Sequence, residues 1–319
     1  MLKNKIVAWF LSFLLLLFFC SLTFTHIRVY LVEKKNPPEG RFIDIENLKI
    51  HYVEKGKGIP LVLLHGVSST LSDFKNSPIF EELAKKARVI IPDRPGYGYS
   101  ERPLKKISPA DQAYILEKFL IKIRAKHPII VGFSWSGSIA TAHALKFPKS
   151  ASGLVFINGA TYPWPTPVDW IHKTGVKPFL GWFFANFLFS PIGTLFQEKN
   201  IKEVFWPSSP PESYKDIPIE LIFRPKQFYA NAEDMVVLKP FLAKQSRKYS
   251  KIDLPVSIIA SEDDLIVSPK IHSIPLHKAV SNSKLITISD AGHPLHHTHP
   301  KEVIKVILEM LNLVNDRSD

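Results

Sequence analysis

The sequence predicts an α/β fold class in which a mostly parallel sheet is covered by helices on both faces. Short, continuous apolar runs recur along the chain, and a segment whose apolar residues have helical spacing follows most of them. Continuous apolar runs are typical of strands buried on both faces, as in parallel sheets. One long segment interrupts this alternation. We therefore expect one α/β core with an insertion.

The composition narrows the class of protein further. Of the 319 residues, 45% are hydrophobic and 22% are charged, which excludes a disordered chain, a coiled coil and a polytopic membrane protein. The single cysteine excludes a disulfide framework and a cysteine-based zinc site. The formal charge of +12 is spread along the chain, without a nucleic-acid-binding motif. We therefore expect no nucleic-acid partner, and a basic surface that suits anionic lipid headgroups.

An apolar run without a charged residue extends from Ile6 to Thr25, after Lys3 and Lys5. About 20 helical residues span the roughly 30 Å hydrocarbon core of a bilayer. We predict an uncleaved, single-pass N-terminal anchor in a membrane, with the bacterial inner membrane as its location. A cleaved signal peptide, which would leave a secreted or periplasmic protein, is the alternative, because both begin with basic residues before an apolar run. No A-x-A-like cleavage site follows the run, which favours the anchor.

The core elements follow in order. A Pro/Gly linker at 36–40 leads to a segment at 42–54 whose apolar and polar residues alternate, as in a hairpin. Continuous apolar runs predict buried strands at 60–64, 89–91, 129–131, 154–157, 254–260 and 285–289. Helical spacing predicts helices at 74–87, 109–125, 135–147, 269–280 and 301–313.

The alternation of strands and helices stops near Thr161 and resumes after about residue 250. The intervening segment carries most of the tryptophans and many prolines, which predicts a helical cap inserted between two strands. Its most apolar part, 177–196, predicts cap helices that pack on the core or a face that touches the bilayer. Glycine and proline interruptions disfavour a second membrane span there. The predicted organisation is an anchor and linker (1–35), a first part of the core (36–160), the cap (161–250) and a second part of the core (251–319).

Residues 131–137, VGFSWSG, close one predicted strand and open one predicted helix. A serine on such a sharp turn exposes its hydroxyl at the carboxyl edge of the sheet, and the residues two positions away must be small. Gly132 and Ser136 meet this demand, so Ser134 is the predicted nucleophile. Ser136 is the alternative, but it would lie inside the helix. The helix N-terminus adds N–H groups that favour a developing oxyanion.

A nucleophilic serine needs a base and an orienting acid. His293 lies between the last strand and the last helix and is the predicted base. Asp264 follows an earlier strand and is the predicted acid, with Asp263 as the alternative. Loops after the carboxyl ends of parallel strands meet at one edge of a sheet, so these side chains are expected to lie over Ser134.

The sequence His65-Gly66-Val67 ends the first predicted buried strand. We expect the backbone N–H groups of Val67 and Trp135 to form the oxyanion hole, and His65 to support the loop. Residues 93–100 contain two glycines, but a third glycine and a following helix are missing. A tight structural loop is therefore expected there, rather than a dinucleotide fingerprint.

With these four motifs in this order, the chain from about Arg41 onward, apart from the insertion, resembles the α/β-hydrolase superfamily. In style it is similar to membrane-anchored, lid-containing bacterial serine hydrolases. The resemblance implies a Ser134–Asp264–His293 triad and a cap that builds the substrate pocket. Haloalkane dehalogenases and epoxide hydrolases share much of this pattern but use an aspartate nucleophile, so serine at position 134 argues against both activities.

We therefore expect two-step acyl transfer on a small-molecule ester with an apolar acyl or alkyl group, with no metal and no organic cofactor. A cofactor-free perhydrolase or haloperoxidase, or a carbon–carbon bond hydrolase, would use the same triad and stays an alternative. A non-catalytic α/β-hydrolase-like binding protein is a second alternative, which the intact triad disfavours.

Two further groups of residues have the residue types of a binding site. The histidines at positions 293, 296, 297 and 299 match no metal-ligand spacing, so those other than His293 are expected at the mouth of the site or at a helix start. Four charged cap residues are expected to form salt bridges or to lie on solvated helix faces, rather than to contact substrate: Glu220, Arg224, Glu233 and Asp234.

Overall fold

The computed structural model describes residues 2–316 and has an eight-stranded sheet at its centre. The strands are β1 (Arg41–Ile45), β2 (Leu48–Lys55), β3 (Pro60–Leu64), β4 (Arg88–Pro92), β5 (Ile129–Phe133), β6 (Gly153–Ile157), β7 (Val256–Ser261) and β8 (Ser283–Ile288). Their order in the sheet is β1-β2-β4-β3-β5-β6-β7-β8. The pairs β1–β2 and β2–β4 are antiparallel and all other neighbours are parallel, which confirms the predicted fold class.

Helices cover both faces of this sheet. Along β3, Val62 and Leu64 belong to the core cluster that includes residues of α4 (Pro109–Lys122), α5 (Gly137–Lys146) and α11 (Ser273–Ala279). Leu61 and Leu63 belong to the other cluster, which includes residues of α3 (Ile79–Ala84) and α13 (Pro300–Asn315). Because side chains alternate along a strand, a continuous apolar run supplies both cores.

Some boundaries differ from those predicted. The helix predicted at 74–87 is divided into α2 (Ser72–Lys75) and α3, because Pro78 lies between them and cannot donate a helical hydrogen bond. The strand predicted from residue 254 begins after Pro255, which also lacks an N–H group. A short helix, α12 (Leu295–Thr298), precedes α13.

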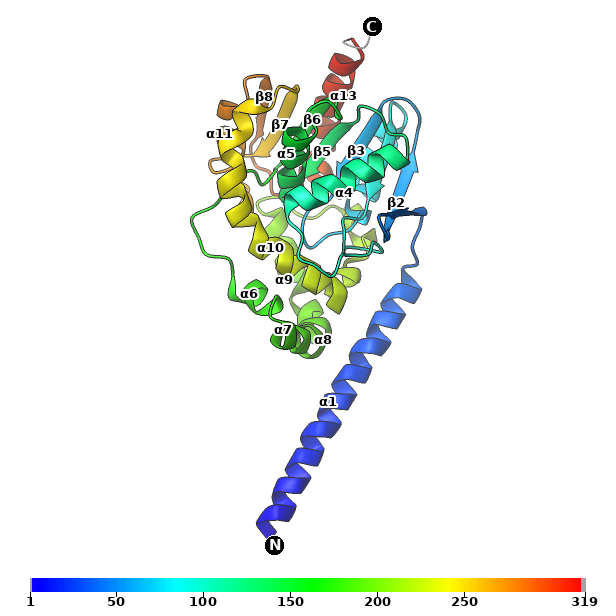
Figure 1. Cartoon of the computed structure of the whole chain (residues 1–319), viewed down its shortest axis with the longest axis vertical. Coiled ribbons are helices and arrows are strands. Elements are labelled where there is room, and N and C mark those ends of the chain that lie inside the picture. Colours follow the sequence, from blue (N-terminus) through cyan, green and yellow to red (C-terminus); the bar gives the residue numbers. More distant parts are fainter. Residues whose placement is uncertain (1, 317–319) are drawn as a thin grey trace.

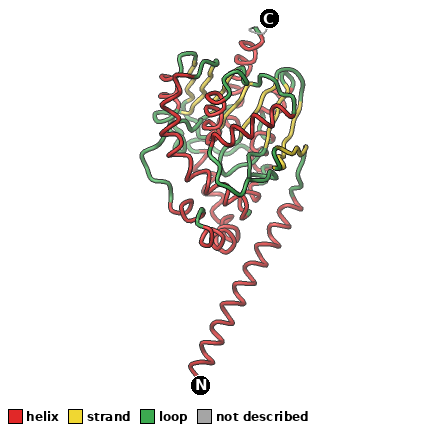
Figure 2. Tube along the Cα trace, viewed as in Figure 1, coloured by secondary structure: helices red, strands yellow, loops and turns green. Residues whose placement is uncertain are grey.

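The segment between β6 and β7 forms no strand and is largely helical (Figures 1 and 2). Its α-helices are α6 (Trp170–Gly175), α7 (Pro178–Phe184), α8 (Ser190–Ile192), α9 (Gln197–Phe205) and α10 (Pro225–Gln245). Its short 3₁₀ or π turns are η2 (Ala185–Phe189), η3 (Gly193–Phe196), η4 (Glu212–Asp216), η5 (Ile219–Phe223) and η6 (Ser246–Lys251). We call 161–250 the cap, as predicted above.

The N-terminal helix α1 (Leu2–Lys35) is 34 residues long and extends away from the body beside the cap (Figure 1). Two helical stretches are long and apolar enough to cross a membrane, residues 4–35 and 178–205. The first contains the predicted anchor. The second is divided among α7, η2, α8, η3 and α9, in agreement with its glycine and proline interruptions.

Candidate active site

Ser134 lies at the turn between β5 and α5, in the 3₁₀ turn η1 (Ser134–Ser136). Its φ angle is +53°, a left-handed conformation that is uncommon for a residue with a side chain and that marks a strained turn. The turn is crowded: a Cβ atom on Gly132 would lie 2.8 Å from the carbonyl oxygen of Ser136. A small residue is therefore required two positions before Ser134, as the sequence pattern demands.

Ser136, the alternative nucleophile, is fully buried, and its hydroxyl donates a hydrogen bond of 2.5 Å to the carbonyl oxygen of His65. This bond joins the turn at Ser134 to the end of β3. The Ser136 hydroxyl thus connects two loops inside the fold, whereas Ser134 lies at the tip of the turn.

His293 and Asp264 are paired. Nδ1 of His293 lies 2.6 Å from Oδ2 of Asp264, and both side chains are buried. The other carboxylate oxygen accepts backbone N–H groups of Ile266 (2.8 Å) and Val267 (2.9 Å), which fix its orientation. Asp263, the alternative acid, instead accepts the backbone N–H of Asp290 at 2.9 Å.

The imidazole ring of His293 packs against the ring of Phe133, with centroids 4.8 Å apart. Phe133 directly precedes Ser134, so this contact holds the base beside the turn that carries the serine. The backbone N–H of His293 donates to the carbonyl oxygen of Val204 in α9 at 3.0 Å. The cap is therefore bonded directly to the residue predicted as the base.

Asn158 is a residue of the site that the sequence reasoning missed. It follows β6, is fully buried and has a φ angle of +44°. Its amide donates to the carbonyl oxygen of His293 at 2.7 Å and its Oδ1 accepts the N–H of Ser261 at 2.8 Å. It thus ties the His293 loop to β7, where Asp264 follows. The sequence feature that could have indicated its role is an asparagine directly after the continuous apolar run of a predicted strand.

The loop at the end of β3 approaches Ser134 closely. A Cβ atom on Gly66 would lie 3.1 Å from Cβ of Ser134. Within residues 2–316, the backbone N–H of Val67 has no hydrogen-bond acceptor. Trp135 lies in the 3₁₀ turn η1, and the helix predicted from residue 135 begins at Gly137. Trp135 therefore follows the serine directly, and Val67 follows the glycine that approaches it, while their role as oxyanion donors stays a prediction.

His65 supports this loop, as expected. Its Nδ1 donates to the carbonyl oxygen of Gly66 (2.8 Å) and its Nε2 accepts the backbone N–H of Arg94 (3.0 Å). Complete burial, reinforced by the charge of Arg94, lowers the pKa of His65 to about 4. The imidazole is therefore neutral at physiological pH, and both nitrogens are used in holding the loop.

Asp234 of α10 is buried and lies at the centre of a hydrogen-bonded network between the cap and the core. Its carboxylate pairs with Arg94 (3.0 Å) and Arg102 (2.8 Å), and its carbonyl oxygen accepts the indole N–H of Trp135 (3.2 Å). Neighbouring Glu233 pairs with Arg102 at 2.9 Å. These contacts agree with the expectation of salt bridges in the cap.

The other two charged cap residues also form ion pairs, in both cases with the end of α1. Arg224 is buried and its guanidinium lies 2.8 Å from the carboxylate of Glu33. Glu220 lies 3.2 Å from the ammonium group of Lys35.

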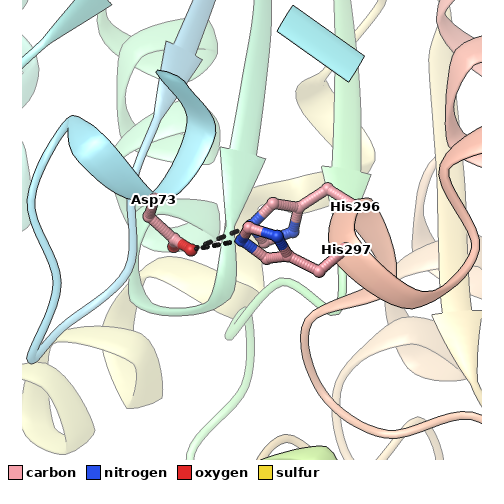
Figure 3. A group of neighbouring side chains, drawn as sticks. All are labelled: Asp73, His296 and His297. Carbon is pink, nitrogen blue, oxygen red and sulfur yellow. Dashed lines mark hydrogen bonds and ion pairs between the residues drawn. The ribbon is translucent and has the colours of Figure 1, made fainter. Parts of the chain in front are cut away.

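One cluster has the residue types of a metal site: Asp73, His296 and His297 (Figure 3). Nε2 of His296 and of His297 lie 3.2 and 2.9 Å from the same carboxylate oxygen of Asp73. Because a carboxylate only accepts, both rings donate Nε2–H to it. The facing histidines lower the pKa of the Asp73 carboxyl well below its ordinary value, although burial alone would raise it.

The surroundings of this cluster fit hydrogen bonding better than metal binding. A histidine that binds a metal donates its other ring N–H to an acceptor. Nδ1 of His296 and Nδ1 of His297 are buried without a partner among the described residues. Both histidines lie in α12, a short helix before the predicted one, while His299 contacts Thr298 at 2.9 Å. The histidines at positions 293, 296, 297 and 299 therefore do not form one ligand set.

Comparison with known proteins agrees with the fold described above. A family model described as alpha/beta hydrolase fold matches residues 59–300. The 2-hydroxymuconate semialdehyde hydrolase of Pseudomonas sp. (strain CF600) is 33% identical over 140 residues, which cover 41% of this chain and 47% of the relative. The haloalkane dehalogenase 2 of Mycobacterium tuberculosis is 33% identical over 130 residues, 40% of this chain and 44% of the relative. The chain thus spans about half the length of these curated relatives.

A longer match covers 86% of this chain and 97% of the 2-hydroxy-6-oxo-2,4-heptadienoate hydrolase of Pseudomonas putida (strain F1), at 22% identity. Among solved structures, a thermophilic esterase from Thermogutta terrifontis has a TM-score of 0.66 and 20% identity, covering 86% of this chain and 99% of its own. The relatives differ in activity, and the family model matches most of the core of this chain. The chain therefore belongs to the alpha/beta hydrolase fold family and is an enzyme of this fold.

Proposed function

We propose that this hydrolase cleaves a carboxylic ester with an apolar acyl or alkyl group through an acyl-enzyme on Ser134. The observation that carries the proposal is the 2.6 Å bond between Nδ1 of His293 and Asp264, beside the turn that holds Ser134. Because Nδ1–H donates to the carboxylate, Nε2 keeps its lone pair and can accept a proton.

The mechanism has two steps. Ser134 attacks the ester carbonyl while Nε2 of His293 takes its proton, and Asp264 stabilises the imidazolium that forms. The N–H groups of Val67 and Trp135 bind the negative oxygen, and each such donor contributes about 3 kcal/mol to transition-state stabilisation. The alcohol leaves with the proton from His293. Water, activated by the same imidazole, then cleaves the acyl-enzyme, so neither a metal nor an organic cofactor takes part.

A carbon–carbon bond hydrolase is the second candidate. Two relatives favour it: the semialdehyde hydrolase at 33% identity, and the heptadienoate hydrolase whose match covers 86% of this chain. Either activity needs the same serine, base and acid. The many aromatic side chains of the cap support an apolar substrate for both, whereas a perhydrolase would replace water by peroxide.

We also propose that α1 is an uncleaved membrane anchor, with the bacterial inner membrane as its location. Residues 4–35 are long and apolar enough to span a bilayer. The contact of Thr25 with the cap supports retention of the helix, because Thr25 ends the apolar run and its hydroxyl donates to the carbonyl oxygen of Asn186. Cleavage after the apolar run would remove the Thr25 contact.

Labelling with a fluorophosphonate probe tests the nucleophile. The purified full chain in detergent is compared with Ser134→Ala and with Ser136→Gly, which keeps a small residue at the crowded turn. We expect labelling to disappear in Ser134→Ala and to persist in Ser136→Gly. Loss of labelling only in Ser136→Gly would identify Ser136 as the nucleophile. If the folded wild type is not labelled, the proposed acyl-enzyme mechanism would be wrong and the non-catalytic alternative would be favoured.

A substrate panel then separates the two activities. p-Nitrophenyl esters of increasing acyl length are compared with a 2-hydroxy-6-oxo-dienoate, and Ser134→Ala serves as the blank. We expect ester turnover that rises with acyl length. Turnover of the dienoate without ester turnover would assign the carbon–carbon activity instead.

A further inference from the structure

The cap has an apolar face that lies beside the N-terminal helix. Six exposed side chains define this cap face: Phe179, Leu180, Phe183, Leu188, Leu195 and Phe196. The exposed fractions of Phe179 and Leu195 are 74% and 78%. Residues 178–197 contain no charged side chain. An apolar patch of this kind marks a surface that is covered in the working protein.

Contacts with α1 fix the depth of this face. The ring of Phe18 stacks on Phe187 with centroids 4.8 Å apart, and also contacts Trp182 at 6.1 Å. The hydroxyl of Thr25, itself buried, donates to the carbonyl oxygen of Asn186 at 2.6 Å. The segment from α7 to η2 therefore lies beside the C-terminal end of the part of α1 that is proposed to span the membrane, and the rest of α1 extends beyond the cap (Figure 1).

The position of Phe18 along α1 gives the depth of these contacts in the bilayer. Phe18 precedes Thr25, the end of the apolar run, by seven residues. At 1.5 Å per residue, this separation is about 10 Å along the helix axis. If residues 6–25 cross the hydrocarbon core, the rings of Trp182 and Phe187 that contact Phe18 lie inside one leaflet, below the level of Thr25. Amphipathic segments at an interface bury their apolar side to about this depth.

We infer that the cap face is inserted into the lipid leaflet around α1, so that the enzyme takes its substrate from the membrane; this rests on the proposed anchor. Exposed Lys173 and Lys177 precede the face, which suits an anionic headgroup layer above it. The face continues directly into α9, whose Val204 carbonyl accepts the N–H of His293 at 3.0 Å. A short stretch of chain thus connects the cap face, which is proposed to contact lipid, with the residue proposed as the catalytic base. The substrate class is an ester dissolved in the bilayer.

Fluorescent labels on the full chain in phosphatidylcholine–phosphatidylglycerol vesicles test the insertion. Single cysteines are placed on a Cys20→Ser background by Phe179→Cys and Leu195→Cys in the face, Leu14→Cys in the anchor and Leu313→Cys in α13. Each is labelled with an environment-sensitive dye and exposed to spin-labelled lipids. We expect quenching at positions 14, 179 and 195, and none at 313.

Each other result contradicts the inference in a distinguishable way. Quenching at position 14 alone would keep the anchor and overturn the inserted face. No quenching at 14 would overturn both, while fluorophosphonate labelling of Ser134 would still report on the hydrolase. A blue-shifted dye at 179 that lipids do not quench would show that a protein surface, such as a second copy, covers the face.

Activity gives a second readout. Phe179→Glu and Leu195→Glu are compared with Leu313→Glu on a long-chain ester in vesicles and a short-chain ester in solution. We expect the ratio of vesicle to soluble kcat/KM to fall about tenfold in the two face variants, because a charge opposes insertion. An equal ratio in all three variants would overturn the inference.

Discussion

Asp234 of the cap and Arg94 of the core form an ion pair of 3.0 Å, with both side chains almost completely buried. The guanidinium of Arg94 lies 4.3 Å from the ring of Trp135, the residue after Ser134. A cap helix thereby sets the position of one proposed oxyanion donor. Charges that are buried together are costly to separate, because the remaining partner stays unpaired in a low-dielectric interior.

We expect Asp234→Asn to lower the free energy of unfolding by about 3 kcal/mol, since it leaves Arg94 without its buried carboxylate. Glu233→Gln is the matched control: among the described residues Glu233 pairs with Arg102 alone, its side chain is 21% exposed, and a loss below about 1 kcal/mol is expected. Urea unfolding in detergent measures both. Equal losses in the two variants would contradict the central place of Asp234.

Features that depend on local constraints could be predicted from the sequence. The turn at Ser134 needs small neighbours at fixed spacing, and the observed φ angle and the crowding at Gly132 agree with that demand. The parallel strands could be predicted because a strand covered by helices on both faces needs apolar side chains on both, and so forms a continuous apolar run. The ends of helices were harder to predict, because Pro78 separates two helices within a segment whose apolar residues keep helical spacing throughout.

Features that depend on long-range packing could not be predicted. Asp263 and Asp264 are adjacent carboxylates in one loop, and only the folded chain directs the second toward His293 and the first toward Asp290. The pairing of Asp73 with His296 joins residues 223 positions apart, and no local pattern encodes it. The contact of Thr25 with Asn186 is of the same kind.

The two adjacent carboxylates make a matched test of the proposed triad. Asp264→Asn keeps the shape of the side chain but cannot hold the imidazolium, and we expect kcat to fall by about 10³- to 10⁴-fold. Asp263→Asn keeps an acceptor for the Asp290 N–H, so a change below about threefold is expected. Steady-state ester hydrolysis measures both. A large loss in Asp263→Asn alone would reassign the acid.

Acid should destabilise the fold through buried, neutral histidines, among them His65 and His272. Burial lowers the pKa of His65 to about 4, with a further contribution from Arg94, and burial lowers the pKa of His272 to about 4. In each, a ring nitrogen accepts a backbone N–H, His272 from Thr161 at 3.2 Å. The unfolded chain binds protons near pH 6.5, whereas the folded chain does so only near pH 4. The free energy of unfolding therefore falls as the pH drops from about 6.5 to 4.

Urea unfolding at pH 7.5, 6 and 5 measures this dependence. The slope of the free energy of unfolding against pH reports how many more protons the unfolded chain binds than the folded chain. We expect His272→Gln to reduce this slope between pH 6 and 5 by up to about 1.4 kcal/mol per pH unit, which corresponds to one proton. His127→Gln, at an exposed position, is the control and should keep the wild-type slope. An unchanged slope in His272→Gln would show that His272 is not held neutral by the fold.

The cluster of Asp73, His296 and His297 should act as a hydrogen-bonded connection that positions the loop of His293, not as a metal centre. Asp73→Ala removes the acceptor of two buried N–H donors, and we expect a loss of about 2–4 kcal/mol in the free energy of unfolding. Glu302→Gln, at an exposed position of α13, is the control and should change it by less than about 0.5 kcal/mol.

Chelation separates the two interpretations of this cluster. A metal-bound histidine needs an acceptor for its other ring N–H, and within residues 2–316 neither Nδ1 atom has one. We therefore expect EDTA to leave kcat unchanged and added zinc to leave the Tm unchanged. A rise in Tm with zinc that Asp73→Ala abolishes would show that the cluster binds the metal. Because His296 and His293 both contact Phe133, at 4.6 and 4.8 Å, such binding would bring a cation to the wall of the active site.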